Sequence, residues 1–223
     1  MQVVSLVPSV TETLLAWGVT PVAVTRFCER PELPAVGGTK DPDGAAVLAL
    51  RPDLVVVNDE ENRREDAAAL TDAGLDVHVV RIGSVVEVAP QLALLAARVG
   101  VRPPEVQDLP RALAPGRRAF VPIWRRPWMT LDGTTYGSSL LSWLGITNVF
   151  EVADRRYPEV TLEEAARRRP DLVVAPSEPY PFGPRHVAEL AELAPVRLVD
   201  GQDLFWWGVR TPAALRRLSA ALA

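Results

Sequence analysis

Large aromatic rings follow several of the short apolar runs in this sequence, at positions expected to be loops. Such rings form a rigid, apolar surface suited to a large, flat ligand, and the alternative is that they fill an interface between two parts of the molecule. Trp206 and Trp207 are adjacent, so both can hardly point the same way. The candidate rings are Phe27, Trp124, Trp128, Tyr136, Tyr180, Phe182, Trp206 and Trp207.

Polar side chains stand at equivalent places and are candidates for hydrogen bonds to the same ligand. They are Ser9, Arg26, Lys40, Asn58, Glu60 and Glu178. The two carboxylates among them could instead be acid–base groups or solvated loop charges. An amide-rich ligand would suit this mixture, because hydroxyl, amide and carboxylate groups pair with amides directly.

No catalytic residue is predicted. The sequence has no G-x-S-x-G, G-x-G-x-x-G or phosphate-loop motif, and Ser9 has no evident His partner. His78 falls in an expected strand and His186 in an expected helix, where structural or surface roles are commoner. Two His and one Cys, far apart in the chain, give no zinc spacing, so no metal site is predicted.

The overall composition excludes several other classes. The 223 residues carry 24 basic and 28 acidic side chains, a net charge of −4, which argues against a nucleic-acid partner. Cys28 is the only cysteine, so no internal disulfide can form. No apolar run approaches the roughly 20 residues that span a bilayer. The first residues lead straight into an apolar run with no signal-peptide pattern.

Apolar runs alternate with helical periods along the chain, and this pattern predicts an α/β fold that would position these side chains. Strands are expected at 2–6, 21–25, 53–57, 76–80, 118–123, 147–150, 171–175 and 196–199. The patterns Ser9-x-x-Glu12 and Thr161-x-x-Glu164 are typical of capping boxes that open helices. Ligands of such sheets bind beyond the carboxyl ends of the strands, where the candidate residues lie.

A repeated pattern divides the chain. RPDLVV occurs at 51–56 and again at 169–174, and TLLAWG at 13–18 is matched by SLLSWLG at 139–145. Similar offsets for two motifs indicate two related lobes, each with a parallel sheet. We predict an N-terminal lobe over 1–83, a long connecting helix over 84–100, a linker over 101–117 and a C-terminal lobe over 118–223, with a ligand cleft between the lobes.

Six segments together resemble the class III, cobalamin-binding-like substrate-binding proteins of ABC importers, also called helical backbone metal receptors. They are SLVPSVTETL (5–14), VGGTK (36–40), RPDLVVVNDEEN (51–62), WRRPWMT (124–130), YPEVTLEE (157–164) and PSEPYPF (176–182). The resemblance implies two Rossmann-like lobes joined by one long helix, with a cobalamin, iron-siderophore or haem held between them. It covers about residues 2–220.

Within that group, the residues favour cobalamin or a related corrinoid as the transported ligand, with no cofactor required. A corrinoid is large, edged with amides and close to neutral, which suits aromatic walls with scattered polar groups. An anionic siderophore would favour several Arg in the cleft. An iron-siderophore or haem remains the alternative ligand, and a cytoplasmic enzyme or regulator on the same scaffold is a further alternative.

The resemblance also implies a permease partner, which acidic residues on the outer faces of both lobes would contact. Glu65 is the candidate in the first lobe, although Arg64 stands beside it, and Glu189 or Glu192 in the second. An extracytoplasmic location, periplasmic or membrane-associated, and a monomeric state are expected on the same ground. The absence of a signal peptide from this sequence leaves a cytoplasmic location open.

Overall fold

The computed structural model describes residues 1–102 and 108–223. The chain divides into two compact units, each with its own sheet. The first unit comprises Met1–Ile82 and Val86–Val106, and the second comprises Gly83–Val85 and Gln107–Ala223. Each is described below by itself.

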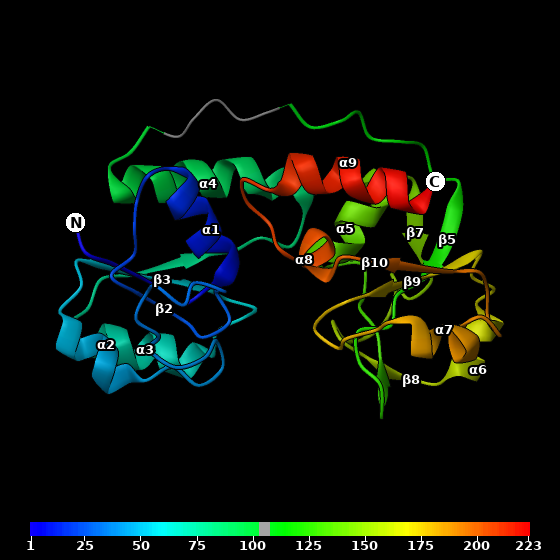
Figure 1. Cartoon of the computed structure of the whole chain (residues 1–223), viewed down its shortest axis with the longest axis horizontal. Coiled ribbons are helices and arrows are strands. Elements are labelled where there is room, and N and C mark those ends of the chain that lie inside the picture. The colour runs from blue at the N-terminus through cyan, green and yellow to red at the C-terminus, as the bar shows by residue number, and fades with distance from the viewer. Residues whose placement is uncertain (103–107) are drawn as a thin grey trace. The chain divides into compact units, whose positions relative to one another are not determined.

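The first unit has a four-stranded sheet in the order β2-β1-β3-β4 with all pairings parallel. The strands are β1 (Val3–Ser5), β2 (Ala23–Val24), β3 (Leu54–Asn58) and β4 (Val77–Val80). The helices are α1 (Pro8–Ala16), α2 (Gly44–Leu50), α3 (Arg64–Asp72) and α4 (Val85–Val99). Helices α2 and α3 cover one face of the sheet, and α1 and α4 lie over the other (Figure 1).

Alternation along the strands explains this layering. Val4, Leu6, Val55 and Val57 pack with Val47 of α2 and other apolar residues in one buried cluster. Strands buried on both faces read as continuous apolar runs, which is why the sequence over 53–57 predicts a central strand.

The second unit repeats the arrangement with a parallel sheet in the order β10-β9-β5-β7 and a separate antiparallel pair, β6 with β8. The strands are β5 (Arg117–Phe120), β6 (Trp128–Met129), β7 (Ile146–Asn148), β8 (Glu159–Val160), β9 (Leu172–Pro176) and β10 (Val196–Val199). The helices are α5 (Tyr136–Trp143), α6 (Leu162–Arg167), α7 (Pro184–Leu190), α8 (Gly201–Phe205) and α9 (Thr211–Leu222).

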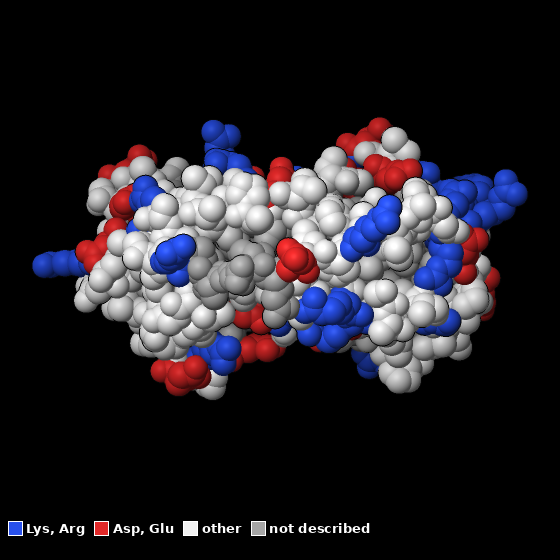
Figure 2. Space-filling model, turned by 90° about the horizontal axis from the view of Figure 1, so that it is seen from above, with Lys and Arg blue, Asp and Glu red and all other residues white. Residues whose placement is uncertain are grey.

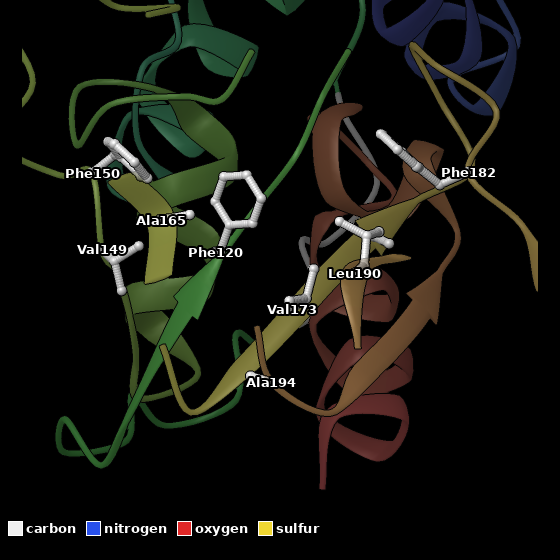
Figure 3. Packing of buried hydrophobic residues seen from close by; sticks show 9 residues of the cluster. Phe120, Val149, Phe150, Ala165, Val173, Phe182, Leu190 and Ala194 are labelled. Atoms are coloured by element: carbon white, nitrogen blue, oxygen red, sulfur yellow. The ribbon is translucent and has the colours of Figure 1, made fainter. Parts of the chain in front are cut away.

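A single apolar cluster holds the α6–α7 side of this unit together. Phe120 lies between Phe150 and Leu190 in the cluster (Figure 3), and the Phe120 and Phe150 rings have centroids 5.9 Å apart. Phe182, from the loop after β9, belongs to the same cluster. The loop that carries several candidate ligand residues is therefore attached to the core.

The sequence repeat has a structural counterpart in each unit. The carboxylate of Asp53 accepts a hydrogen bond from the Gln2 backbone N–H at 2.6 Å, and that of Asp171 accepts one from the Arg118 N–H at 2.8 Å. The preceding Arg51 and Arg169 both adopt left-handed backbone conformations, with φ of 47° and 50°. The same residues thus end a helix and start a central strand in both units.

The two predicted helix starts have different outcomes. Thr161 and Glu164 form the predicted capping box, with the Thr161 N–H donating to Glu164 Oε2 at 2.7 Å and the Glu164 N–H to Thr161 Oγ1 at 3.1 Å. The capping box predicted at Ser9 is wrong. Helix α1 begins at Pro8, so Ser9 lies inside its first turn rather than before it. Proline at the first helical position needs no N–H partner and sets this earlier start.

Helix α4 lies where the long helix was predicted, and its buried residues Leu92, Leu95, Ala96 and Val99 form the expected apolar stripe. From Val86 onward it groups with the first unit. Its role as a connection between lobes stays a prediction, as do the predicted lobe boundaries. Of the predicted linker over 101–117, residues 103–107 lie outside the described part of the chain, and 108–116 form neither helix nor strand.

Candidate functional site

Four rings of the second unit form what we call the aromatic cluster: Trp124, Trp128, Tyr180 and Phe182. Trp128 stacks on Phe182 with centroids 6.0 Å apart, and Tyr180 contacts Phe182 at 4.7 Å. Trp124 meets Tyr180 edge to face at 5.6 Å. The structure thus brings four of the predicted rings together.

Exposure is graded across the aromatic cluster. Trp124 is 44% exposed, Trp128 and Tyr180 are half-buried, and Phe182 is 5% exposed within the core. An apolar surface anchored in a core on one side and open on the other is typical of a binding surface, because the anchored rings need no ordering when a ligand arrives.

An ion pair borders the aromatic cluster. The Arg125 guanidinium donates to both carboxylate oxygens of Glu189, at 3.0 and 3.2 Å, and lies 5.8 Å from the centre of the Trp128 ring. A bidentate pair fixes the plane of the guanidinium. Glu189, proposed from the sequence as a permease contact, is therefore engaged with Arg125 in this unit.

The backbone of the loop after β9 packs closely against Gly201. A Cβ on Gly201 would lie 2.5 Å from the backbone nitrogen of Glu178, so the chain can pass here only with glycine. The Gly201 N–H also donates to Ser177 Oγ at 2.9 Å. This contact positions Glu178, two residues before Tyr180, at the carboxyl end of β9.

Among the described residues, the other predicted rings of the second unit, Tyr136, Trp206 and Trp207, do not stack on the aromatic cluster. Trp207 is 3% exposed, while the half-buried Trp206 has the Arg210 guanidinium 4.9 Å from its ring centre. Tyr136 is also buried, and its hydroxyl pairs with Thr211 Oγ1 at 2.9 Å. Burial raises the pKa of the Tyr136 phenol far above its ordinary value, so this group stays neutral.

Arg210 and Arg217 both pair with Asp203, a carboxylate that the sequence analysis did not select. Asp203 is 3% exposed and accepts from Arg217 at 2.6 and 2.7 Å, while Arg210 lies 3.6 Å away. Burial was the missing signal, since an Asp in a loop sequence reads as solvated until its partners are known.

In the first unit, Asn58, Glu60 and Lys40 come together beyond the carboxyl end of β3. Asn58 Oδ1 accepts from the backbone N–H groups of Glu60 and Glu61 at 3.0 and 2.9 Å. The Lys40 ammonium donates to the Glu60 carbonyl at 2.6 Å. These contacts give Asn58 and Lys40 a role in shaping the loop, and their direct contact with a ligand stays a prediction.

Asn62 joins these loops and was missed by the sequence analysis. Its amide donates to the carbonyls of Leu6 at 3.1 Å and Thr39 at 3.0 Å, while its Oδ1 accepts from the Asn58 N–H at 2.7 Å. One buried side chain thus ties three segments that are distant in sequence. It lies within the RPDLVVVNDEEN segment, but only the tertiary contacts reveal its function.

Arg26 and Phe27 form a second pair in this unit. The Arg26 guanidinium donates to both oxygens of Asp41, at 2.8 and 2.9 Å, and lies 4.8 Å from the centre of the Phe27 ring. Phe27 is 50% exposed. Gly38 permits the arrangement, because a Cβ there would lie 2.4 Å from Asp41 Oδ1.

Ser9 is 1% exposed, and its hydroxyl has no hydrogen-bond partner among the residues that the structure describes. Nearby in sequence, Thr11 Oγ1 lies 3.2 Å from the Sγ of Cys28, which Thr25 Oγ1 also approaches at 3.2 Å. Cys28 therefore sits in a buried hydroxyl environment, in agreement with a structural role.

Neither a metal site nor a patch of one charge accompanies the candidate residues in the described part of the chain. Across residues 1–102 and 108–223, no group of three or more His, Cys, Asp or Glu could hold a metal ion, and no helix there is long and apolar enough to cross a membrane. Basic and acidic side chains lie interspersed on the face shown in Figure 2, so a phosphate backbone laid across it would meet both signs.

Comparison with known proteins finds relatives over nearly the whole chain, although no family model matches. The vitamin B12-binding protein of Salmonella choleraesuis is 25% identical over 78% of this chain and 71% of its own length. The periplasmic vitamin B12-binding protein of Vibrio cholerae superposes with a TM-score of 0.79 at 21% identity, covering 99% of this chain and 96% of that one. The haem-binding protein of Roseiflexus sp. RS-1 gives 0.79 at 19% identity, covering 99% and 97%.

The chain has the fold of the periplasmic vitamin B12- and haem-binding proteins. This confirms the resemblance to class III substrate-binding proteins and the predicted α/β fold class with two lobes. These relatives are named as binding proteins, not as enzymes.

The residues predicted to contact a permease lie on helix α3 and on or just after helix α7. Glu65 is exposed in the first turn of α3, and Glu192 is exposed just after α7. Their role, like that of each predicted ligand residue, stays a prediction.

Proposed function

We propose that this protein is a substrate-binding protein that holds cobalamin or a related corrinoid and delivers it to an ABC importer. The observation that carries the proposal is the aromatic cluster, whose open edge at Trp124 continues through Tyr180 into the buried Phe182. A corrin ring is broad and flat enough to lie against such a surface. Relatives named for vitamin B12 binding support the same ligand.

Three arginines already pair with carboxylates, which favours a ligand close to neutral. Arg26 pairs with Asp41, Arg125 pairs with Glu189, and Arg210 lies against Asp203. An anionic siderophore would have to compete with these carboxylates for the guanidinium groups. The amide edges of a corrinoid need only hydrogen-bond donors and acceptors.

Haem is the second candidate, because haem-binding proteins are among the structural relatives. Haem iron needs an axial ligand such as His, Cys, Met or Tyr. Of these, Tyr180 is half-buried within the aromatic cluster and is a side chain that could turn toward an iron atom.

Isothermal titration calorimetry with cyanocobalamin and with haemin separates the two candidates. Saturable cyanocobalamin binding at micromolar concentration or below supports the proposal, and its absence overturns it. Haemin binding with a Soret shift that Tyr180→Phe abolishes would assign haem instead. Trp17→Phe, half-buried at the end of α1 in the other unit, is the matched control and should leave either affinity within about twofold.

Partner and location follow from the same proposal. The loaded protein would dock on the permease through Glu65 and Glu192, with Glu189 available only if it leaves Arg125. It would work as a periplasmic or membrane-associated monomer and would perform no covalent chemistry. Pull-down of the permease by wild-type protein, and its loss with Glu65→Arg or Glu192→Arg, tests the docking assignment.

A further inference from the structure

A buried histidine contacts two members of the aromatic cluster. His186 is 4% exposed, and its ring lies 5.4 Å from the centroids of both Tyr180 and Phe182, edge to face in each case. Its Nε2 lies 3.4 Å from the Tyr180 hydroxyl. His186 is thus the polar residue directly behind the rings proposed to meet the ligand.

The hydrogen bond from Gly183 corresponds to one protonation state of His186. The Gly183 backbone N–H donates to His186 Nδ1 at 3.1 Å, as in a capping box at the start of α7. An N–H group can only donate, so Nδ1 is unprotonated when this bond is present. The neutral ring then carries its proton on Nε2, from which it can donate to the Tyr180 hydroxyl. A second proton on Nδ1 would break the bond to Gly183.

Charges around the ring oppose a second proton. The Arg185 Nε–H lies 3.3 Å from His186 Nε2 and can donate to it only when Nε2 is unprotonated, so this longer contact and the Gly183 bond at 3.1 Å exclude each other in the neutral ring, and Arg125 is also close enough to act on the ring. Burial lowers the pKa of His186 below its ordinary value, and these two guanidiniums lower it further, while Glu189 acts in the opposite direction. Tyr180, Arg185, Arg125 and Glu189 are the titratable groups around the imidazole.

We propose that neutral His186, protonated on Nε2, positions Tyr180 and Phe182 within the aromatic cluster, so that acidification releases these rings and weakens ligand binding. This inference rests on the proposed function for its ligand, whereas the ring positioning is a property of the protein alone. His186 acts through the two rings and is a positioning residue. Protonation of His186 on Nδ1 breaks the hydrogen bond from Gly183 and places a cation beside the guanidiniums of Arg185 and Arg125.

The protein offers a matched control, because it contains only two histidines. His78 lies on β4 in the first unit, whereas the aromatic cluster belongs to the second unit. His186→Gln keeps an acceptor for the Gly183 N–H and a donor for Tyr180, but it cannot titrate. His78→Gln removes the other imidazole and leaves His186 untouched.

Ligand-free measurements test the positioning directly. In the ¹⁵N-histidine NMR spectrum of the wild-type protein, His186 should be the Nε2–H tautomer near neutral pH, and an Nδ1–H tautomer would overturn the inference. Acrylamide quenching of Trp fluorescence should rise between pH 7.5 and 5.0 in wild type and in His78→Gln, and stay constant in His186→Gln. An equal rise in His186→Gln would also overturn it.

Titration with cyanocobalamin adds the functional arm. Affinity should fall by up to about tenfold per pH unit below the His186 transition in wild type and His78→Gln, and remain constant in His186→Gln. Unchanged pH dependence in His186→Gln contradicts the proposal. If no variant binds cyanocobalamin at pH 7.5, the proposed function fails while the tautomer and quenching measurements still decide the ring positioning. If His186→Gln does not fold, the wild-type tautomer and its titration decide it.

Discussion

The indole of Trp128 lies parallel to the phenyl ring of Phe182, with an interplanar angle of 5° and centroids 6.0 Å apart. Trp128 comes from β6, and Phe182 comes from the loop after β9, more than 50 residues later. The contact joins the half-buried Trp128 to the buried Phe182. The aromatic cluster is therefore anchored in the core of the second unit.

The exposed end of the aromatic cluster should matter for binding and little for stability. Trp124→Ala removes a ring that is 44% exposed, and we expect the free energy of unfolding to fall by less than about 1 kcal/mol. Affinity for cyanocobalamin should fall at least about tenfold, or ~1.4 kcal/mol, by calorimetry. Val152→Ala, at a side chain 86% exposed in the same unit, should change neither quantity.

Phe182, at the buried end of the aromatic cluster, should matter mainly for the free energy of unfolding. Phe182→Ala leaves a cavity in the α6–α7 core and should lower the free energy of unfolding by about 3–5 kcal/mol in urea titrations. Phe182→Leu retains most of the volume and should cost less than about 1.5 kcal/mol. Equal costs for the two variants would mean that Phe182 is not packed as described.

Replacement of the buried Asp203 should strongly lower the free energy of unfolding. Removing it by Asp203→Ala leaves Arg210, whose side chain is 14% exposed, without this carboxylate and should cost about 3 kcal/mol. Arg217→Met should cost much less, since the Arg217 side chain is 56% exposed. Chemical denaturation of both single variants and of the double variant gives the coupling energy, and a value near zero would rule out the ion pair as a stabilising contact.

The two repeat-equivalent aspartates should respond alike. Asp53→Ala and Asp171→Ala each remove one carboxylate that accepts a backbone N–H, and each should cost about 1 kcal/mol. The effects should add in the double variant because the residues lie in different units. A strongly unequal pair of costs would contradict the structural equivalence of the two turns.

Stability should decrease on mild acidification. Burial lowers the pKa of both His78 and His186, so below about pH 6.5 the unfolded chain binds more protons than the folded one. This stabilisation is fully present above that pH and is lost as the pH falls toward the folded-state values. Urea unfolding at pH 7.5 and 5.5 should show the loss, and the double variant His78→Gln/His186→Gln should reduce it.

Sequence alone determined the strands of the two parallel sheets and the repeat, but it did not predict the short antiparallel pair β6 and β8. RPDLVV predicts two central strands because a continuous apolar run can be satisfied only by burial on both faces, and both strands are present. It also placed Trp124, Tyr180 and Phe182 outside the strands, after the carboxyl ends of strands, since the residues that follow such strands must leave the sheet at that edge. Trp128 was predicted on the same loop, which is wrong, because it lies in β6 and pairs with β8.

Only the tertiary structure decided which of these residues act together. Tyr136 and Trp207 are buried, Glu189 is committed to Arg125, and His186 lies behind the rings rather than on the surface. The capping box at Ser9 failed because Pro8 already starts the helix. Local propensity reports on neighbours within a few residues, whereas burial and pairing depend on segments 50 or more residues apart, as the 64-residue separation of Arg125 and Glu189 illustrates.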